Sequence, residues 1–192
     1  MARLIKKNPG FHPRRWLSQL PKMDAFGALL FQVVGQQLSV DATRGILRKI
    51  MSLFNDQMPT PKRLLAVPPG KLHKRGGLSR RKVSTLRLLA RRFVDGSLSQ
   101  KKFEKMTDEQ IENELTQIPG IGPWTVHGFL IIALDRPDVV LPGDLALRKV
   151  IKRVYRMKDL PTEAKVLQMS ERWRPYRSLA TGYLFQSAYG AE

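Results

Sequence analysis

Cysteine is absent from this chain of 192 residues. Disulfides, thiolate zinc sites, cysteine nucleophiles and iron–sulfur clusters held by cysteine are therefore excluded. Acidic residues are few: 16 Asp and Glu stand against 34 Lys and Arg, which gives a formal net charge of +18. This excess favours a polyanionic partner, and nucleic acid is the leading candidate because each neutralised phosphate releases a condensed counterion. The alternative is a basic protein that its charge keeps soluble.

Long apolar segments are missing too. The longest apolar run, 129–134, is far too short to span a bilayer. Lys6 and Lys7 are followed by Asn-Pro-Gly and not by an apolar run, so no signal peptide is visible. The histidines have no metal-ligand spacing, and neither a nucleophilic triad nor a Walker loop is present. We expect a soluble intracellular protein without membrane contact, associated with the nucleoid in a prokaryotic cytoplasm or nuclear in a eukaryote.

Helical periodicity runs through most of the chain. A hydrophobic fraction of 42% is enough to fill a core, and the length suits a single domain, 1–192. Thr107 and Gln110 form a capping-box pattern, and Pro123 suits the first turn of the next helix. Because no segment alternates with period two, the sequence predicts an all-α fold with a helix-hairpin-helix at about 107–134. Apolar residues recur at helical spacing in 24–35, 40–54, 82–94, 145–155 and 178–189.

The segment Ile118–Trp124, IPGIGPW, has the pattern of a tight hairpin between two helices. Gly120 and Gly122 let the backbone turn sharply and approach another molecule closely. The amide groups there, together with the start of the following helix, offer a site for a phosphate. An ordinary helix–helix turn also uses glycines. In so basic a chain, the pattern favours a grip on the backbone of DNA.

Asp144 follows a Pro-Gly turn and precedes an apolar helical segment. The local sequence favours an N-cap, which needs no chemistry. The other interpretation is a single acid that stabilises a cation formed on a sugar. Both roles are compatible, because the positive end of a helix favours the ionised carboxylate.

Several other residues have two interpretations. Trp124, Tyr183 and Phe185 suit either a core or a pocket that stacks an extruded base. The polar loop 35–39, GQQLS, either caps the helix that follows it or reaches into a DNA groove. Cationic clusters suit either solvated helix faces or DNA contacts; the best placed follows Asp144 and consists of Arg148, Lys149, Lys152 and Arg153.

Together these segments resemble the HhH-GPD superfamily of DNA glycosylases, and within it the 3-methyladenine DNA glycosylase II branch, which acts on alkylated bases. The resemblance extends from about Asp24 to Phe185. It implies a compact, two-lobed helical fold with the active-site cleft between the lobes and no additional N-terminal β domain. Five blocks in the family's order carry it: GQQLS at 35–39, GLSRRK at 77–82, IPGIGPWTV at 118–126, LPGDLALRK at 141–149 and WRPYRSLATGYLF at 173–185.

The resemblance also implies roles for individual residues. Asp144 matches the catalytic aspartate, and Trp124 and Phe185 match aromatic positions of the base pocket. The implied cofactor is at most a Na⁺ or K⁺ ion, which the carbonyl groups of Thr116, Ile118 and Gly120 hold when DNA is bound. Gln37 matches the side chain wedged into the duplex, and Leu78 a second intercalating element. The implied DNA-binding residues are Gln37, Ser39, Leu78, Gly120, Ile121, Gly122, Arg148 and Lys149.

The implied activity is that of a monofunctional, monomeric enzyme of base excision repair acting on double-stranded DNA with damaged bases. Superfamily members that also cut the strand have a lysine where Trp124 stands, so the amine nucleophile of a lyase is missing here. Gly128 replaces a bulky aromatic of some relatives, which predicts a pocket more open on that side. Two alternatives remain: a glycosylase for deaminated or oxidised bases, and a non-catalytic DNA-binding module.

Overall fold

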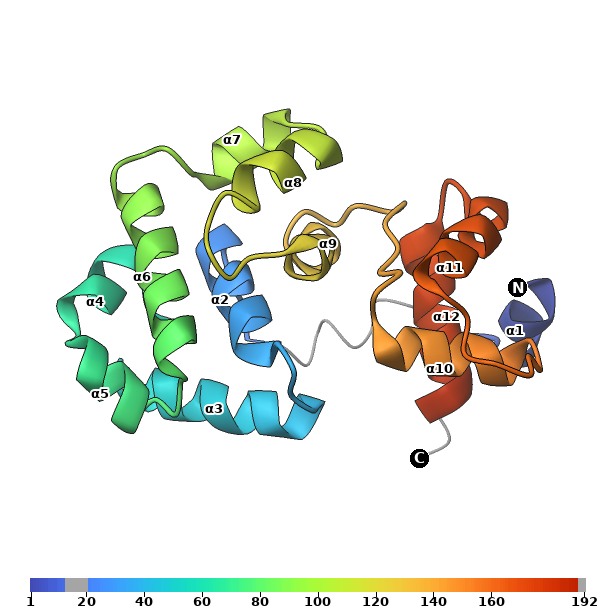
Figure 1. The fold of residues 1–192 in the computed structure, drawn as a ribbon, viewed down its shortest axis with the longest axis horizontal. Coiled ribbons are helices and arrows are strands. Elements are labelled where there is room, and N and C mark those ends of the chain that lie inside the picture. Colours follow the sequence, from blue (N-terminus) through green and yellow to red (C-terminus); the bar gives the residue numbers. More distant parts are fainter. Residues whose placement is uncertain (13–20, 190–192) are drawn as a thin grey trace. The chain divides into compact units, whose positions relative to one another are not determined.

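The computed structural model describes residues 1–12 and 21–189, and every regular element among them is a helix (Figure 1). The prediction of an all-α fold is confirmed. The chain divides into two compact units. The first consists of Met1–Leu20 and Asp135–Glu192, and the second of Pro21–Leu134. Among the described residues, no helix has both the length and the apolar character needed to cross a membrane.

The second unit is built around α2 (Ala25–Gly35), whose side chains are almost all buried. Helices α3, α6 and α9 pack on it. A row of aromatic rings extends this core: the centroids of Phe26 and Phe93 lie 5.4 Å apart, and those of Phe103 and Phe129 lie 5.1 Å apart. The other helices of the unit are α3 (Val40–Ser52), α4 (Pro61–Ala66), α5 (Pro69–Lys74), α6 (Arg80–Val94), α7 (Gln100–Lys105), α8 (Asp108–Leu115) and α9 (Pro123–Ile132).

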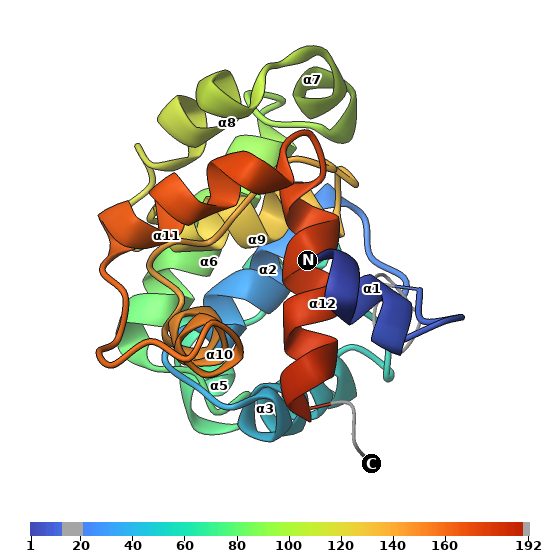
Figure 2. The same cartoon turned by 90° about the vertical axis from the view of Figure 1, so that its right-hand side faces the viewer.

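The first unit has its own core. In Figure 2, α1 (Ala2–Lys7) lies against α12 (Arg177–Tyr189), and α10 (Leu145–Val154) also packs on α12. The unit is completed by α11 (Glu163–Ser170) and the 3-10 turn Glu171–Trp173. Its hydrophobic core cluster consists of Val140, Leu147, Val150, Ile151, Val166, Trp173, Ala180 and Leu184.

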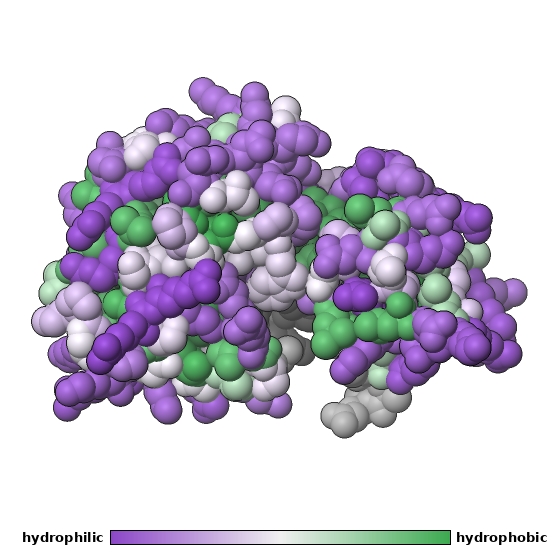
Figure 3. Space-filling view, viewed as in Figure 1, coloured by the Kyte–Doolittle hydropathy of each residue, from purple (hydrophilic) through white to green (hydrophobic). Residues whose placement is uncertain are grey.

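Helix starts follow the local chemistry of the sequence. The side chain of Asp24 accepts a hydrogen bond from the N–H of Gly27, and Ser79 does the same for Lys82. Thr107 and Gln110 form the predicted capping box, with distances of 2.9 and 3.2 Å. Hydrophilic side chains cover much of the surface of each unit on the face drawn in Figure 3, as the net charge of +18 leads one to expect.

Candidate active site

The predicted hairpin lies between α8 and α9 in the second unit. Helix α8 ends at Leu115 and α9 begins at Pro123, with Gly122 as its N-cap and no side chain capping it. The side chains of Ile118 and Ile121 are buried, and the N–H of Ile121 donates to the carbonyl oxygen of Ile118 at 3.0 Å. Ile121 therefore anchors the turn, and its amide is already used within it.

The two glycines of the hairpin differ in whether the surrounding structure leaves room for a side chain. Gly120 has φ +93°, and a Cβ on it would lie 2.3 Å from Oγ1 of Thr85, so the fold itself requires a glycine there. Thr85 is buried and donates to the carbonyl oxygen of Pro119 at 2.8 Å. A Cβ on Gly122 would meet no atom within 4 Å. Open space at the uncapped start of a helix suits the close approach of an anion.

A second loop is tied to this hairpin. Nε2 of Gln36 donates to the carbonyl oxygen of Gly120 at 2.9 Å and to Oγ1 of Thr125 at 2.8 Å. The next residue, Gln37, is exposed and has φ +58°. The loop 35–39 therefore holds the predicted wedge residue in a left-handed backbone conformation, which is fixed by its neighbour.

Lys82 of α6 forms hydrogen bonds to the backbone at the start of the same loop. Its Nζ donates to the carbonyl oxygen of Val34 at 2.8 Å and to that of Gln36 at 2.9 Å, at the C-terminal end of α2. Burial lowers the pKa of Lys82 from its ordinary value. Gln36, Lys82 and Thr85 were missed by the sequence reasoning. The one signal for the last two was their spacing of three residues, which places both on one side of a helix.

Ser39 and Leu78 were both expected to contact DNA, and the structure places them in different environments. Ser39 is exposed, but its hydroxyl caps α3 by accepting from the N–H of Ala42 at 3.2 Å, so the capping interpretation is confirmed. Leu78 is only 2% exposed, and its carbonyl oxygen accepts a hydrogen bond from Nδ1 of His73 at 2.6 Å. The expectation of an intercalating Leu78 is therefore wrong for this conformation, because the side chain is part of the core.

Trp124 lies on the first turn of α9 and is half-buried. Gly128 lies one turn later on the same face of the helix. The prediction of open space beside Gly128 is wrong. A Cβ on Gly128 would lie 2.4 to 2.6 Å from the three end atoms of the Gln32 side chain, so the carboxamide of Gln32 fills this space.

Asp144 is the N-cap of α10 in the first unit. Its Oδ1 accepts a hydrogen bond from the N–H of Leu147 at 2.7 Å, which confirms the capping interpretation. The carboxylate is half-buried, and the backbone N–H of Asp144 donates to the carbonyl oxygen of Leu141 at 3.1 Å. The capping hydrogen bond therefore fixes the orientation of this carboxylate.

The other candidate residues of the first unit differ in their contacts. Nε of Arg148 donates to the carbonyl oxygen of Pro161 at 2.7 Å, so this side chain also holds the loop before α11. Lys149 is exposed. Phe185 is half-buried and packs against the core of the unit. Tyr183 is structural, because its hydroxyl donates to the carbonyl oxygen of Phe11 at 3.3 Å.

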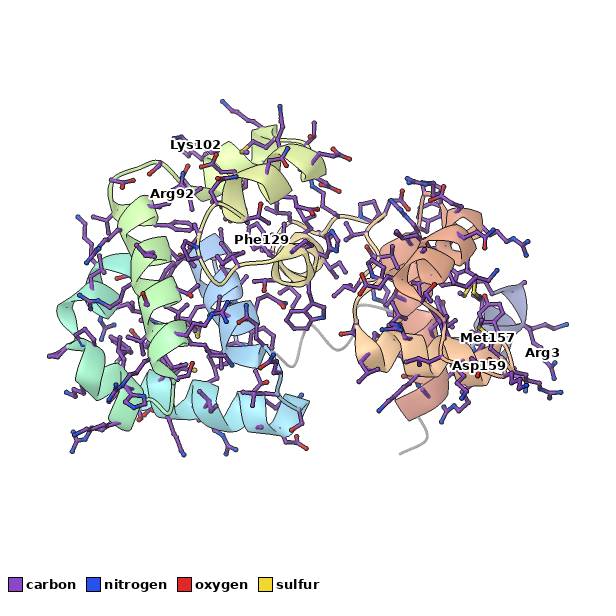
Figure 4. The ribbon with its side chains drawn as sticks, in the orientation of Figure 1. Arg3, Arg92, Lys102, Phe129, Met157 and Asp159 are labelled. Carbon is purple, nitrogen blue, oxygen red and sulfur yellow. The ribbon has the colours of Figure 1, made fainter. Side chains whose placement is uncertain are left out.

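Not all of the basic clusters are available to a partner. Arg92 and Lys102, labelled in Figure 4, lie on the outside of the second unit, whereas Phe129 points into its core. Arg92 forms an ion pair with Glu114. Nζ of Lys102 donates to the carbonyl oxygen of Gly96 at 2.7 Å. These two cations support the fold.

Two of the carbonyl groups predicted to bind a cation already accept hydrogen bonds within the protein. The oxygen of Ile118 accepts from the N–H of Ile121, and that of Gly120 accepts from Gln36. Each carbonyl oxygen has two lone pairs, so a second interaction is open to it. Neutral oxygen ligands suit a hard monovalent ion. Among residues 1–12 and 21–189, no group of three or more His, Cys, Asp or Glu is arranged to hold a metal.

The structure brings some of the predicted residues together within each unit. The hairpin, Gln37 and Trp124 belong to the second unit, and the loop before α3 is bonded directly to the hairpin. Asp144, Arg148, Lys149 and Phe185 belong to the first unit. The hairpin and Asp144 thus belong to different units.

Known proteins are similar to this chain in sequence and in fold. DNA-3-methyladenine glycosylase 1 of Schizosaccharomyces pombe is 32% identical over 97% of this chain and 81% of its own length. DNA-3-methyladenine glycosylase 2 of Escherichia coli is 29% identical over 82% of this chain, which spans 56% of that relative.

The solved structures agree with these relatives. The S. pombe 3-methyladenine DNA glycosylase in complex with abasic DNA superposes with a TM-score of 0.88 at 31% identity, covering 97% of this chain and 90% of the other. An endonuclease III–DNA complex has a TM-score of 0.68 at 21% identity and shares the fold. The model of the HhH-GPD superfamily of base excision DNA repair proteins matches residues 31–175. On this evidence, the chain belongs to the HhH-GPD superfamily.

Proposed function

We propose that this protein is a monofunctional DNA glycosylase that excises alkylated bases and so initiates base excision repair. One observation carries the proposal: a chain similar to a 3-methyladenine glycosylase over 97% of its length holds the carboxylate of Asp144 at the start of α10. The basic composition and the hairpin support binding to double-stranded DNA. The place of action is then wherever the cell keeps its DNA, and the enzyme acts as a monomer.

The chemistry needs little beyond this carboxylate. Alkylation at a ring nitrogen of a purine puts positive charge on the base, which then leaves as a neutral molecule. The costly species is the oxocarbenium-like sugar, and an ionised Asp144 near C1′ stabilises its charge or orients the attacking water. A second carboxylate, which most glycoside hydrolases use, is unnecessary because the leaving group needs no strong acid.

The remaining residues bind and position the DNA. The uncapped start of α9 and the open space at Gly122 receive a phosphate. The carbonyl groups of Thr116, Ile118 and Gly120 would hold a Na⁺ or K⁺ ion against that phosphate, and this ion would supply only positive charge. Gln37 fills the gap left by the extruded nucleotide.

The damaged base leaves the stack at a cost that its weakened pairing reduces. Trp124 and Phe185 then receive it. Trp124 cannot form a Schiff base, so hydrolysis leaves an abasic site without cutting the strand.

The test is a base-release assay on matched duplexes that carry methylated, deaminated or oxidised bases. The proposal predicts release of the damaged base from the duplexes with 3-methyladenine or 7-methylguanine. The strand should stay intact until the abasic site is treated with alkali. Release confined to deaminated or oxidised bases would favour the second glycosylase class instead. Binding without release from any duplex would favour a non-catalytic module.

A further inference from the structure

Gln32 and Gln36 lie close together in the sequence but differ in the hydrogen bonding of their side-chain amides. Gln36 has two hydrogen-bond partners. Gln32, one turn earlier on α2, is only 6% exposed, yet no hydrogen bond joins its carboxamide to another described residue. The polar atoms of this carboxamide are not among the fully buried atoms without a partner, so solvent reaches them. The hydrogen-bonding groups of Gln32 are therefore open to a ligand.

The position of the carboxamide suggests which ligand it meets. Its three end atoms lie where a Cβ on Gly128 would be, at 2.4 to 2.6 Å, so Gln32 touches the backbone of α9 at Gly128. Helices α2 and α9 pack directly on each other. Trp124 lies four residues before Gly128, on the same face of α9. The amide is therefore placed beside the helix face that carries the proposed stacking residue.

The amide also has the right chemistry for a base. A carboxamide offers one acceptor oxygen and two N–H donors, and the edge of a purine presents the same two kinds of group. A site built to hydrogen-bond a substrate discriminates strongly against ligands that leave its polar groups unpaired. A purely aromatic pocket would lack this discrimination.

We propose that Gln32 is a specificity-determining residue whose carboxamide hydrogen-bonds the edge of the extruded base. The proposal rests on the proposed glycosylase function and deepens it. Gly128 is the complementary part of this arrangement, because any side chain at that position would displace the amide. The base then takes the place of solvent at the hydrogen-bonding groups of Gln32.

The test compares Gln32→Met, which keeps the length of the side chain and removes its polar atoms, with the wild type. For duplexes with 3-methyladenine or 7-methylguanine we expect kcat/KM to fall about tenfold, the effect of one lost neutral hydrogen bond. Affinity for a duplex with a tetrahydrofuran abasic-site analogue should stay unchanged, because this ligand has no base. The melting temperature should not fall, because no hydrogen bond between the Gln32 carboxamide and another described residue is lost.

Gln36→Met is the matched control, since it removes an amide that supports the hairpin. It should weaken binding to the abasic duplex and lower the melting temperature. If Gln32→Met does not fold, Gln32→Asn carries the same expectation, because it draws the amide back by one methylene.

Three results would overturn the role of Gln32. These are wild-type excision by the variant, a parallel loss of affinity for the abasic duplex, and a lower melting temperature with unchanged kcat/KM. Failure of the proposed function would look different, because the wild-type protein itself would then release no base from the methylated duplexes.

Discussion

The side-chain amide of Gln36 donates to the carbonyl oxygen of Gly120 at 2.9 Å and so joins two loops that are 84 residues apart in the sequence. One loop presents Gln37, and the other is the hairpin proposed to grip a phosphate. Lys82 and Thr85 of α6 fix the same two loops, at the carbonyl groups of Gln36 and Pro119. The two loops that we propose to contact DNA are therefore fixed relative to each other within this unit.

Gln36→Met removes both hydrogen bonds of this link. We expect the free energy of unfolding to fall by about 1 to 3 kcal/mol, because the polar partners are left unpaired. Affinity for an abasic duplex should fall as well, since Gln37 and the hairpin lose their common support. Gln100→Met is the control, because the Gln100 amide donates to Glu104 on its own helix and joins no two loops. Equal effects of the two substitutions would contradict the linking role of Gln36.

Gly120→Ala tests the close contact at the hairpin. The new Cβ would meet Oγ1 of Thr85 at 2.3 Å in a backbone with φ +93°. A loss of roughly 1 to 3 kcal/mol in the free energy of unfolding is expected from the left-handed backbone alone, with more from the clash. Gly122→Ala has φ in the ordinary range and an open surrounding, so urea unfolding should show little change. Comparable destabilisation by both would argue against this account of the turn.

Asp138 makes the stability of the first unit depend on pH. Partial burial alone would raise its pKa, but hydrogen bonds from Arg177 and the charges of Arg177 and Arg174 outweigh this and hold the pKa below 3.8. Because the folded state depresses the pKa, the stabilisation is complete above 3.8 and is lost as pH falls through the folded value.

The measurement for Asp138 is the free energy of unfolding of Asp138→Asn and the wild type between pH 6 and pH 2. The variant should be less stable at pH 6, and the difference should shrink as the pH falls below 3.8. Asp159→Asn, at an exposed position of the same unit, should have little effect at any pH. A difference for Asp138→Asn that stays constant with pH would contradict the ion-pair explanation.

Salt should weaken DNA binding steeply, because the affinity of so basic a chain comes largely from counterion release. Lys149→Gln should weaken binding to damaged and undamaged duplexes alike and make the slope of log K against log salt smaller by about 1. Arg174→Gln is the control, since Arg174 already forms ion pairs with Asp138 and Glu171. A slope that Lys149→Gln does not change would remove Lys149 from the interface.

The helices that the sequence predicted well are those with clear caps and long apolar faces. The segment 24–35 became α2 with Asp24 as its cap, and 145–155 became α10 with Asp144 as its cap. Four six-residue helices, α1, α4, α5 and α7, were not predicted. Each is too short to repeat an apolar face and is stabilised by tertiary packing instead. Helices α4 and α5 pack on α6, α1 packs on α12, and the ring of Phe103 in α7 lies against that of Phe93 in α6.

The site was predictable where a residue's role follows from its immediate neighbours. The capping geometry of Asp144 and Ser39 follows from local chemistry. The burial of Leu78 does not, because an apolar residue in a loop is a core residue or an exposed one depending on contacts distant in sequence. The same holds for Gln32 and Gln36. These are chemically identical side chains, and their different environments result from tertiary packing: Gln32 lies against α9, and Gln36 is bonded to the hairpin.

The most direct test of the central claim is single-turnover release of 3-methyladenine by Asp144→Asn. Asparagine is as good an N-cap as aspartate, so the cap on α10 and the melting temperature should be retained. The negative charge is lost, and base release should therefore fall by at least about a hundredfold, while affinity for an abasic duplex stays close to that of the wild type. Wild-type release by a folded Asp144→Asn would contradict the assignment of Asp144 as the catalytic residue.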